Sequence, residues 1–264
     1  SRTGRGHHRN PVQRLTTPSL GGKRRSCTSE GQDAGGRAHC SRSRRGSSGG
    51  GWIVVRTVHG KVAKRVASPK CFEPLELRGI RLNNHFVAAP VASGTGEEHS
   101  GAPSSRAREL YTPLAASGVG MVVLEHAAVR ADGKVRRGQF LLDRDDLVGA
   151  YSTLLEPFRE AGTPVVIQLN HAGSAVKDSK LLVPGFVAVS ASSVPHPRDE
   201  IGVVPRPLAE REMPLLVEDF AAAARRALQA GFAGVELHAC HGFLLGQFLS
   251  PVTNHRRDAY GGDI

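Results

Sequence analysis

The sequence predicts an α/β protein in which helices cover a parallel sheet. One pattern recurs three times after about residue 105: apolar residues at helical spacing, a glycine, and then a continuous apolar run that ends in polar residues. Continuous apolar runs are typical of strands that are buried on both faces, as in parallel sheets beneath helices. Together with an earlier run, these strands begin near residues 85, 120, 164 and 233.

The length of this repeat predicts a TIM (β/α)8 barrel of which about the first four β/α units are present. The four strands occupy about 180 residues, whereas a complete barrel takes about 250. Half a barrel exposes two parallel sheet edges, so we expect a fragment rather than a complete small domain. A doubly wound sheet is the alternative, but no Gly-rich phosphate loop follows the first strand.

Residues 1–66 are predicted to be a separate basic tail rich in Arg, Gly and Ser, disordered or not part of the native protein. They carry 15 Lys and Arg against two acidic residues, while residues 67–264 have a net charge of −2. Apolar residues are scarce up to Gly51 and show no period, so the tail cannot bury a core. An RNA-binding arm is the alternative, but the tail has no aromatic residue before Trp52 to stack on bases.

The four cysteines, Cys27, Cys40, Cys71 and Cys240, are too few and too scattered for a disulfide framework. The sequence has no signal-peptide core and no long apolar run, which argues against secretion and membrane spanning. A reducing cytoplasm is therefore the expected location.

The predicted elements follow in order from Phe72. A short hairpin turns at Arg78-Gly79 and leads into a strand around residues 86–91. Glycines end the three helices. The helices cover 110–115, 147–158 and 216–228, and the strands after them cover 120–129, 164–172 and 233–237. A Pro-rich loop, residues 173–207, precedes the last helix and is expected to cover the site, since loops at strand ends carry function in such folds.

Two histidines after the last strand are the strongest candidates for chemistry, although by themselves they suit a capping or core role equally well. His238 and His241 would lie on opposite faces of an extended strand, so they converge only if the chain curls after His238. His241-Gly242 permits such a curl. With Cys240 they could also be read as a metal cluster, but the spacing matches no zinc pattern and lacks a third hard ligand, so we expect no metal.

Four segments resemble the Old Yellow Enzyme family of NADH:flavin oxidoreductases, which fold as TIM barrels. They are FEPLELRGIRLNNHFVAAP, VVIQLNHAG, GVELHACHGFLLGQFLSP and TNHRRDAYGG. The resemblance covers residues 72–264, roughly the first half of the family's catalytic domain, and residues 1–66 have no counterpart in it.

The resemblance implies a non-covalent FMN that is reduced by NADH or NADPH and passes hydride to an activated alkene, an enone or a related small molecule. By motif, Ala89, Pro90, Val91 and Ala92 would lie against the flavin ring, with His126 beside it. Gln168 would bond the pyrimidine edge. His238 and His241 would donate to the carbonyl oxygen of the substrate. From the sequence itself we expect no membrane partner, and a nucleic-acid partner only through the basic tail; formation of a homo-oligomer stays open.

The chain also departs from the family pattern. Phe243 stands where many members have the tyrosine that protonates the α-carbon, Ala92 where relatives have Thr or Cys, and Gly94 where some have Tyr. The family's fifth-strand Arg or Lys and its phosphate-binding loops would lie beyond Ile264. We therefore expect the chain by itself to bind FMN weakly and to be inactive.

Several alternatives remain open from the sequence. The chain could be a non-catalytic remnant whose basic tail binds RNA or a partner, or a flavoenzyme similar to dienoyl-CoA reductase. Gln168 could bond the backbone instead of a flavin, and His171 is as well suited to a structural as to a functional role. Glu125 is expected to pair internally with a neighbouring strand. Arg256, Arg257 and Asp258 are expected to form a structural ion pair that fixes a loop, with a direct role in the site as the alternative.

Overall fold

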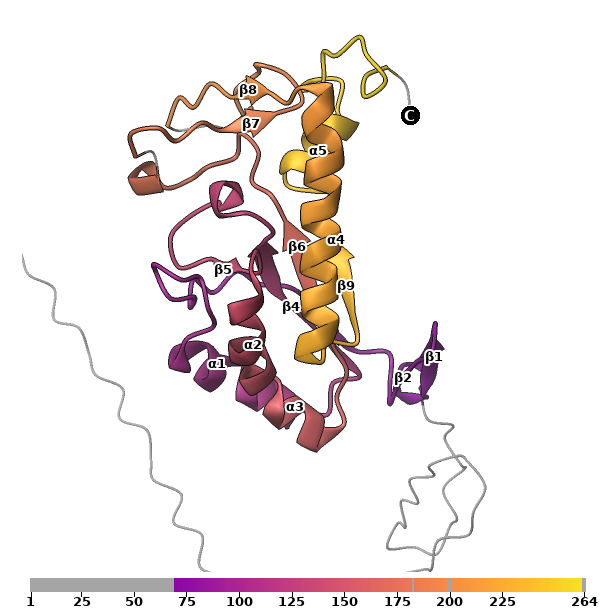
Figure 1. Ribbon diagram of the computed structural model, residues 1–264. Coiled ribbons are helices and arrows are strands. Elements are labelled where there is room, and N and C mark those ends of the chain that lie inside the picture. Colours follow the sequence, from indigo (N-terminus) through magenta and orange to yellow (C-terminus); the bar gives the residue numbers. More distant parts are fainter. Residues whose placement is uncertain (1–68, 182, 199–200, 263–264) are drawn as a thin grey trace, which may run out of the picture. The chain divides into compact units, whose positions relative to one another are not determined.

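The computed structural model describes residues 69–181, 183–198 and 201–262, which form a parallel sheet with helices packed on it (Figure 1). The strands pair in the order β3, β4, β6, β9, and each pair is parallel. Strands that follow one another in the chain are therefore neighbours in space. A doubly wound sheet reverses its strand order, so this arrangement does not support that alternative. The strands are β3 Val87–Ala88, β4 Met121–Ala128, β6 Val165–Asn170 and β9 Gly234–Leu237, with the short β5 Phe140–Leu141 beside β4.

Helices connect these strands, as the repeat predicted. They are α1 Ser105–Ala115, α2 Val148–Leu154, α3 Glu156–Ala161 and α4 Met213–Ala230. Gly162 and Gly231 end α3 and α4 in the left-handed conformation that glycine adopts without strain. The prediction of one continuous second helix was wrong: it breaks at Leu155. Pro157 lacks an N–H and its ring crowds the preceding turn, so a new helix begins there.

The core lies between the helices and one face of the sheet. Tyr151 is fully buried, donates to the Leu141 carbonyl at 3.0 Å, and meets the rings of Phe140 and Phe232 edge-on. Around it pack strand residues that point toward the helices and small residues that let α4 approach: Val122, Leu124, Val165, Ile167, Leu169, Ala223 and Ala227. This packing leaves the opposite face of the sheet and the strand ends for other contacts.

The predicted hairpin is β1 Leu75–Leu77 and β2 Ile80–Leu82. Arg78 and Gly79 both have positive φ, 45° and 84°, as a type I′ two-residue turn requires. The long loop contains its own parallel strand pair, β7 Val189–Ser190 and β8 Arg206–Pro207, which the sequence did not predict. The remaining elements are α5 Leu244–Leu249 and short 3-10 turns at Lys70–Phe72, Ala131–Gly133, Asp145–Leu147, Ser179–Leu181 and Glu210–Glu212.

Both edges of the central sheet are open within the described residues, since β3 and β9 each pair with a single neighbour. Val87 on β3 and Leu237 on β9 are about half exposed, at 45% and 55%. The predicted basic tail and its boundary at residue 66 lie outside the described residues. Among the helices of the described part, none combines the length and apolar character needed to cross a membrane.

Candidate functional site

The polar residues of the site gather where the parallel strands end. The segment Ala89–Ala92 continues β3, and Ala89, Val91 and Ala92 in it are exposed while Pro90 is half-buried. Val91 is 72% exposed, which is unusual for a valine beside a sheet. The predicted flavin-contacting segment is therefore an accessible, mostly apolar surface.

Buried Glu125 holds this segment in place. Its carboxylate accepts from the Ser93 backbone N–H at 2.7 Å and from the Ser93 hydroxyl. It also accepts from the Tyr111 hydroxyl of α1 at 2.9 Å, and burial raises the pKa of that phenol well above its usual range. Glu125 does pair internally, but its partners Tyr111 and Ser93 lie on α1 and in the segment after β3, not on a neighbouring strand as predicted.

His126 is buried near the end of β4 and is oriented by an amide. Its Nδ1 lies 3.0 Å from Gln139 Nε2, which also donates to Asn170 Oδ1 at 2.8 Å. Because the Gln139 oxygen accepts from the Val135 N–H, the amide nitrogen is the donor to the ring. The His126 proton then sits on Nε2. Burial lowers the pKa of His126, so the ring is held as a neutral donor.

Gln168 lies on β6 directly across from Glu236 of β9. Its Nε2 donates to Glu236 Oε1 at 2.5 Å. Its protein partner is thus the side chain of Glu236 and not a backbone group, which was one of the two predicted partners. The amide nitrogen of Gln168 has a hydrogen-bond partner on the neighbouring strand. Such a partner is expected because the side chain is buried, at 7% exposure.

His238 and His241, hereafter the histidine pair, converge as the curl hypothesis requires. His241 has φ of 57° and Gly242 has φ of 69°, so the chain turns back directly after β9. His238 Nε2 and His241 Nδ1 are 3.2 Å apart, and the ring centroids are 5.0 Å apart. His238 is buried and His241 is exposed. Burial, helped by the neighbouring His126 and His241, lowers the pKa of His238 to about 4.

Phe243 packs against both His126 and His238, whose rings also meet each other edge-on with centroids 5.9 Å apart. Its ring stacks on His126 with centroids 5.6 Å apart and meets His238 edge-on at 4.6 Å. On its other side it packs against Val135, Ala172 and Val176. The ring orients both histidines by contact, and it offers no exchangeable proton.

A buried amide, Gln247 of α5, ties the turn to two other loops. Its Nε2 donates to the carbonyls of Gly242 at 2.7 Å and Ala172 at 3.1 Å. Its Oε1 accepts from the Ser174 N–H at 3.2 Å and from the Ser190 hydroxyl at 2.8 Å. The sequence analysis missed Gln247. A polar residue within the apolar run LLGQFL was the available signal, because a buried amide needs partners.

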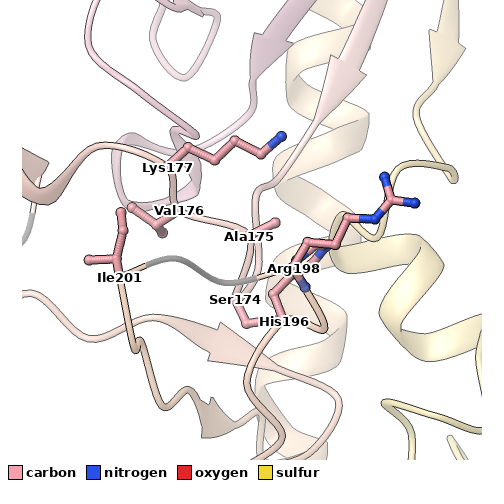
Figure 2. A pocket seen from close by; sticks show the side chains of 7 residues that line it. All are labelled: Ser174, Ala175, Val176, Lys177, His196, Arg198 and Ile201. Carbon is pink, nitrogen blue, oxygen red and sulfur yellow. Dashed lines mark hydrogen bonds between the residues drawn. The ribbon is translucent and has the colours of Figure 1, made fainter.

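The long loop packs against the turn, as expected of a loop that covers the site. A cavity of about 190 Å³ lies between the first residues of this loop and three residues further along it, His196, Arg198 and Ile201 (Figure 2). His196 lines it and lies so close to Gly242 that a Cβ there would be 2.3 Å from Nε2. Figure 2 shows Val176 and Ile201 on one side, away from the charged ends of Lys177 and Arg198. Ser174 and Ala175 complete the lining.

Two further predicted residues have structural partners. His171 is buried, accepts from the Gly173 N–H at 3.1 Å, and has Nε2 3.6 Å from Asp132 Oδ1. Arg256 pairs with Asp258 and donates to the Ala191 carbonyl at 3.1 Å, so the predicted ion pair that fixes a loop is confirmed.

The sequence of the chain is similar to those of known proteins. Residues 70–264 match the model of the NADH:flavin oxidoreductase / NADH oxidase family. The chain is 36% identical over 193 residues to an NADPH dehydrogenase of Listeria monocytogenes serotype 4a (strain HCC23), covering 73% of this chain and 55% of that protein. It is 34% identical over 197 residues to an NADH oxidase of Thermoanaerobacter brockii, covering 74% of this chain and 30% of that protein.

The fold is also similar to solved structures of an old yellow enzyme homologue and of morphinone reductase. An old yellow enzyme homologue from Zymomonas mobilis superposes with a TM-score of 0.66 at 29% identity, covering 74% of this chain and 55% of that one. Morphinone reductase in complex with tetrahydroNAD also gives 0.66, at 27% identity, covering 74% and 56%. The chain thus spans about half the length of the Listeria enzyme and of these two proteins, and less of the NADH oxidase.

The Gln247 contacts predict a specific stability loss. Gln247→Leu leaves the Ser174 N–H and the Gly242 carbonyl without the partner that Gln247 provides, while the Ala172 carbonyl keeps its bond from the Ala175 N–H. Each unsatisfied buried group costs about 1–3 kcal/mol. We expect the free energy of unfolding in urea to fall by at least about 2 kcal/mol. The control Leu249→Gln, on the exposed side of the same helix, should stay within about 0.5 kcal/mol. Equal stability of the two variants would contradict the role assigned to Gln247.

The low pKa of His238 predicts a pH effect on stability. The unfolded histidine takes up its proton near pH 6.5, whereas the folded one does so only at about pH 4. Between these values the unfolded chain binds the extra proton, so stability falls as the pH falls. His238→Gln lacks this loss. The free energy of unfolding in urea should therefore fall less for the variant than for the wild type as the pH is lowered from 7 to 4.5. An equal fall in both proteins would be evidence against the assignment.

Proposed function

Because this chain belongs to the NADH:flavin oxidoreductase / NADH oxidase family, we propose that residues 69–262 provide the flavin-ring and substrate side of an FMN-dependent oxidoreductase that uses NAD(P)H. The observation that carries the proposal is the convergence of the histidine pair beside His126 and Phe243 at the strand ends. The acceptor is an enone or related activated alkene. The two described cysteines, Cys71 and Cys240, are free thiols, in keeping with a cytoplasmic location.

The residues present fit the ring of FMN. Ala89–Ala92 offers an accessible apolar surface, with Val91 largely exposed, and the Glu125 contacts to Ser93 hold its end. Gln168 and His126 supply polar groups from neighbouring strands. The Gln168 amide would bond the pyrimidine edge of the ring, and the Nε2–H of His126 would lie beside it. When bound, the flavin accepts hydride from NAD(P)H and delivers it to the acceptor.

The histidine pair would hold the acceptor's carbonyl oxygen. An imidazole N–H from each ring, directed at one point, stabilises negative charge on that oxygen as an enolate forms. The low pKa of His238 keeps that ring neutral at pH 7, so it donates a hydrogen bond without transferring its proton. Phe243 fixes the ring edge-on but supplies no proton, so the α-carbon takes its proton from solvent or from a group other than residue 243.

We also propose that the sheet is the first half of an eight-stranded barrel. The sequential parallel order and the open edges at β3 and β9 support this interpretation. In the family, the phosphate of FMN is held by loops after the last strands, to which no described residue of this chain corresponds. The alternatives of an RNA-binding remnant and of a dienoyl-CoA-reductase-like enzyme gain no support from the described residues.

The half-barrel interpretation predicts weak FMN binding by the 264-residue chain. Without the charge-assisted contacts to the phosphate, the ring contacts alone should not retain the cofactor through purification. The measurement is the flavin-to-protein ratio from the absorption spectrum. A yellow protein with stoichiometric flavin would disprove this part of the proposal.

The substrate role of the histidine pair is tested in a chimera that adds the remaining residues of the Bacillus subtilis NADPH dehydrogenase after Ile264. That relative is 31% identical over 194 residues. His238→Ala with His241→Ala should weaken binding of a phenol about tenfold or more, the loss expected when two oxygen-directed donors are removed, and leave flavin content unchanged. His85→Ala, at an exposed histidine far along the chain, is the control. Unchanged phenol affinity, measured by calorimetry, would remove the pair from the site.

A further inference from the structure

The turn after β9 brings together three metal-ligating groups, those of His238, Cys240 and His241. One nitrogen from each ring and the Cys240 Sγ all lie within 4.8 Å of one another. Sγ is 3.2 Å from His238 Nδ1 and 3.7 Å from His241 Nδ1. The other nitrogen of His238, Nε2, lies 3.2 Å from His241 Nδ1. The spacing in the sequence argued against a metal, but the curl of the chain places these atoms closer than an extended strand would.

These separations are close to those of a tetrahedral zinc site. Bonds of about 2.0–2.1 Å to nitrogen and about 2.3 Å to sulfur place neighbouring ligand atoms about 3.3–3.6 Å apart. The observed distances of 3.2 and 3.7 Å lie just to either side of that range. Two of the three separations therefore already suit zinc, and the third, between the two ring nitrogens, is within the 4.8 Å that a rotation of the exposed His241 side chain can close.

The protein holds this arrangement before any ion binds. The left-handed backbone of His241 and Gly242 sets the curl, and Gln247 bonds the Gly242 carbonyl at 2.7 Å. His238 is fixed by the edge-on ring of Phe243. Cys240 and His241 are exposed, which gives an ion a path to the site.

We propose that His238, Cys240 and His241 bind a thiophilic divalent cation of the zinc class, with three protein ligands and one open position. Imidazole nitrogen and thiolate are the ligands that such cations prefer. The thiol loses its proton to solvent on binding, and its negative charge partly offsets that of the cation. This site goes beyond the proposed oxidoreductase function, which needs no metal, and it depends on Cys240, which has no role in that function.

Cobalt(II), which binds in zinc sites and has a visible spectrum, is the probe. The test uses the full 264-residue chain with Cys27→Ser, Cys40→Ser and Cys71→Ser, so that Cys240 is its one thiol. Titration should produce a near-ultraviolet sulfur-to-cobalt charge-transfer band together with the visible bands of tetrahedral cobalt. Zinc should displace the cobalt and abolish both sets of bands.

Single variants in the same background identify the ligands. Cys240→Ala should abolish the charge-transfer band, and His238→Ala or His241→Ala should weaken cobalt binding by about tenfold or more, since even loss of groups outside the ligand shell costs that much. His255→Ala, at an exposed histidine outside the cluster, should bind as the parent does, with circular dichroism as the check on folding.

Absence of the charge-transfer band in the parent, or cobalt affinity unchanged by Cys240→Ala, would overturn the proposal. The titration involves no flavin, NAD(P)H or phenol. Its failure would therefore leave the oxidoreductase proposal untouched, and failure of the phenol test in the chimera would leave the metal site standing.

Discussion

The left-handed turn at His241-Gly242 is the constraint on which the site depends. In an extended chain the two histidines would point to opposite faces, and no oxygen or ion could meet both. A non-glycine residue in this conformation costs about 1 kcal/mol, and His241 adopts it with φ of 57°. The bond from Gln247 to the Gly242 carbonyl offsets that cost, and His196 leaves no room for a side chain at Gly242. A strained turn is thus stabilised by contacts from α5 and from the long loop.

Burial favours the neutral form of both His126 and His238. His126 and His238 both have pKa values lowered mainly by burial, so both are neutral near pH 7. A neutral ring whose other nitrogen accepts a bond has a defined tautomer, and Gln139 imposes one on His126. Donors fixed in this way need no rearrangement when charge develops on a bound oxygen. The same neutrality leaves a ring nitrogen available to a cation.

Local signals in the sequence predicted much of the fold, whereas the site depends on contacts that it does not reveal. Glycines after helices and continuous apolar runs depend on neighbouring residues, so they predicted β4, β6 and α4 closely. The bond between Gln168 and Glu236 depends on strand register, which sets residues 68 positions apart side by side. Gln247 and Gln139 likewise bond groups brought close only by tertiary folding. The histidine pair was predicted because its motif and the capacity of the chain to curl are both local.

Phe243 limits the chemistry that the proposed function can include. Its ring is 5% exposed and packs on His126 and His238, at a position where the resemblance to the family implies a tyrosine in many members. His241 and Cys240 are exposed, so water can approach the oxygen-binding position from their side. Under the proposed function the protein therefore controls where the carbonyl oxygen lies, through two fixed rings, while protonation of the product is left to a less constrained partner. Under this proposal, such a site recognises the carbonyl group of its acceptor but exerts little control over the face of the α-carbon to which the proton is added.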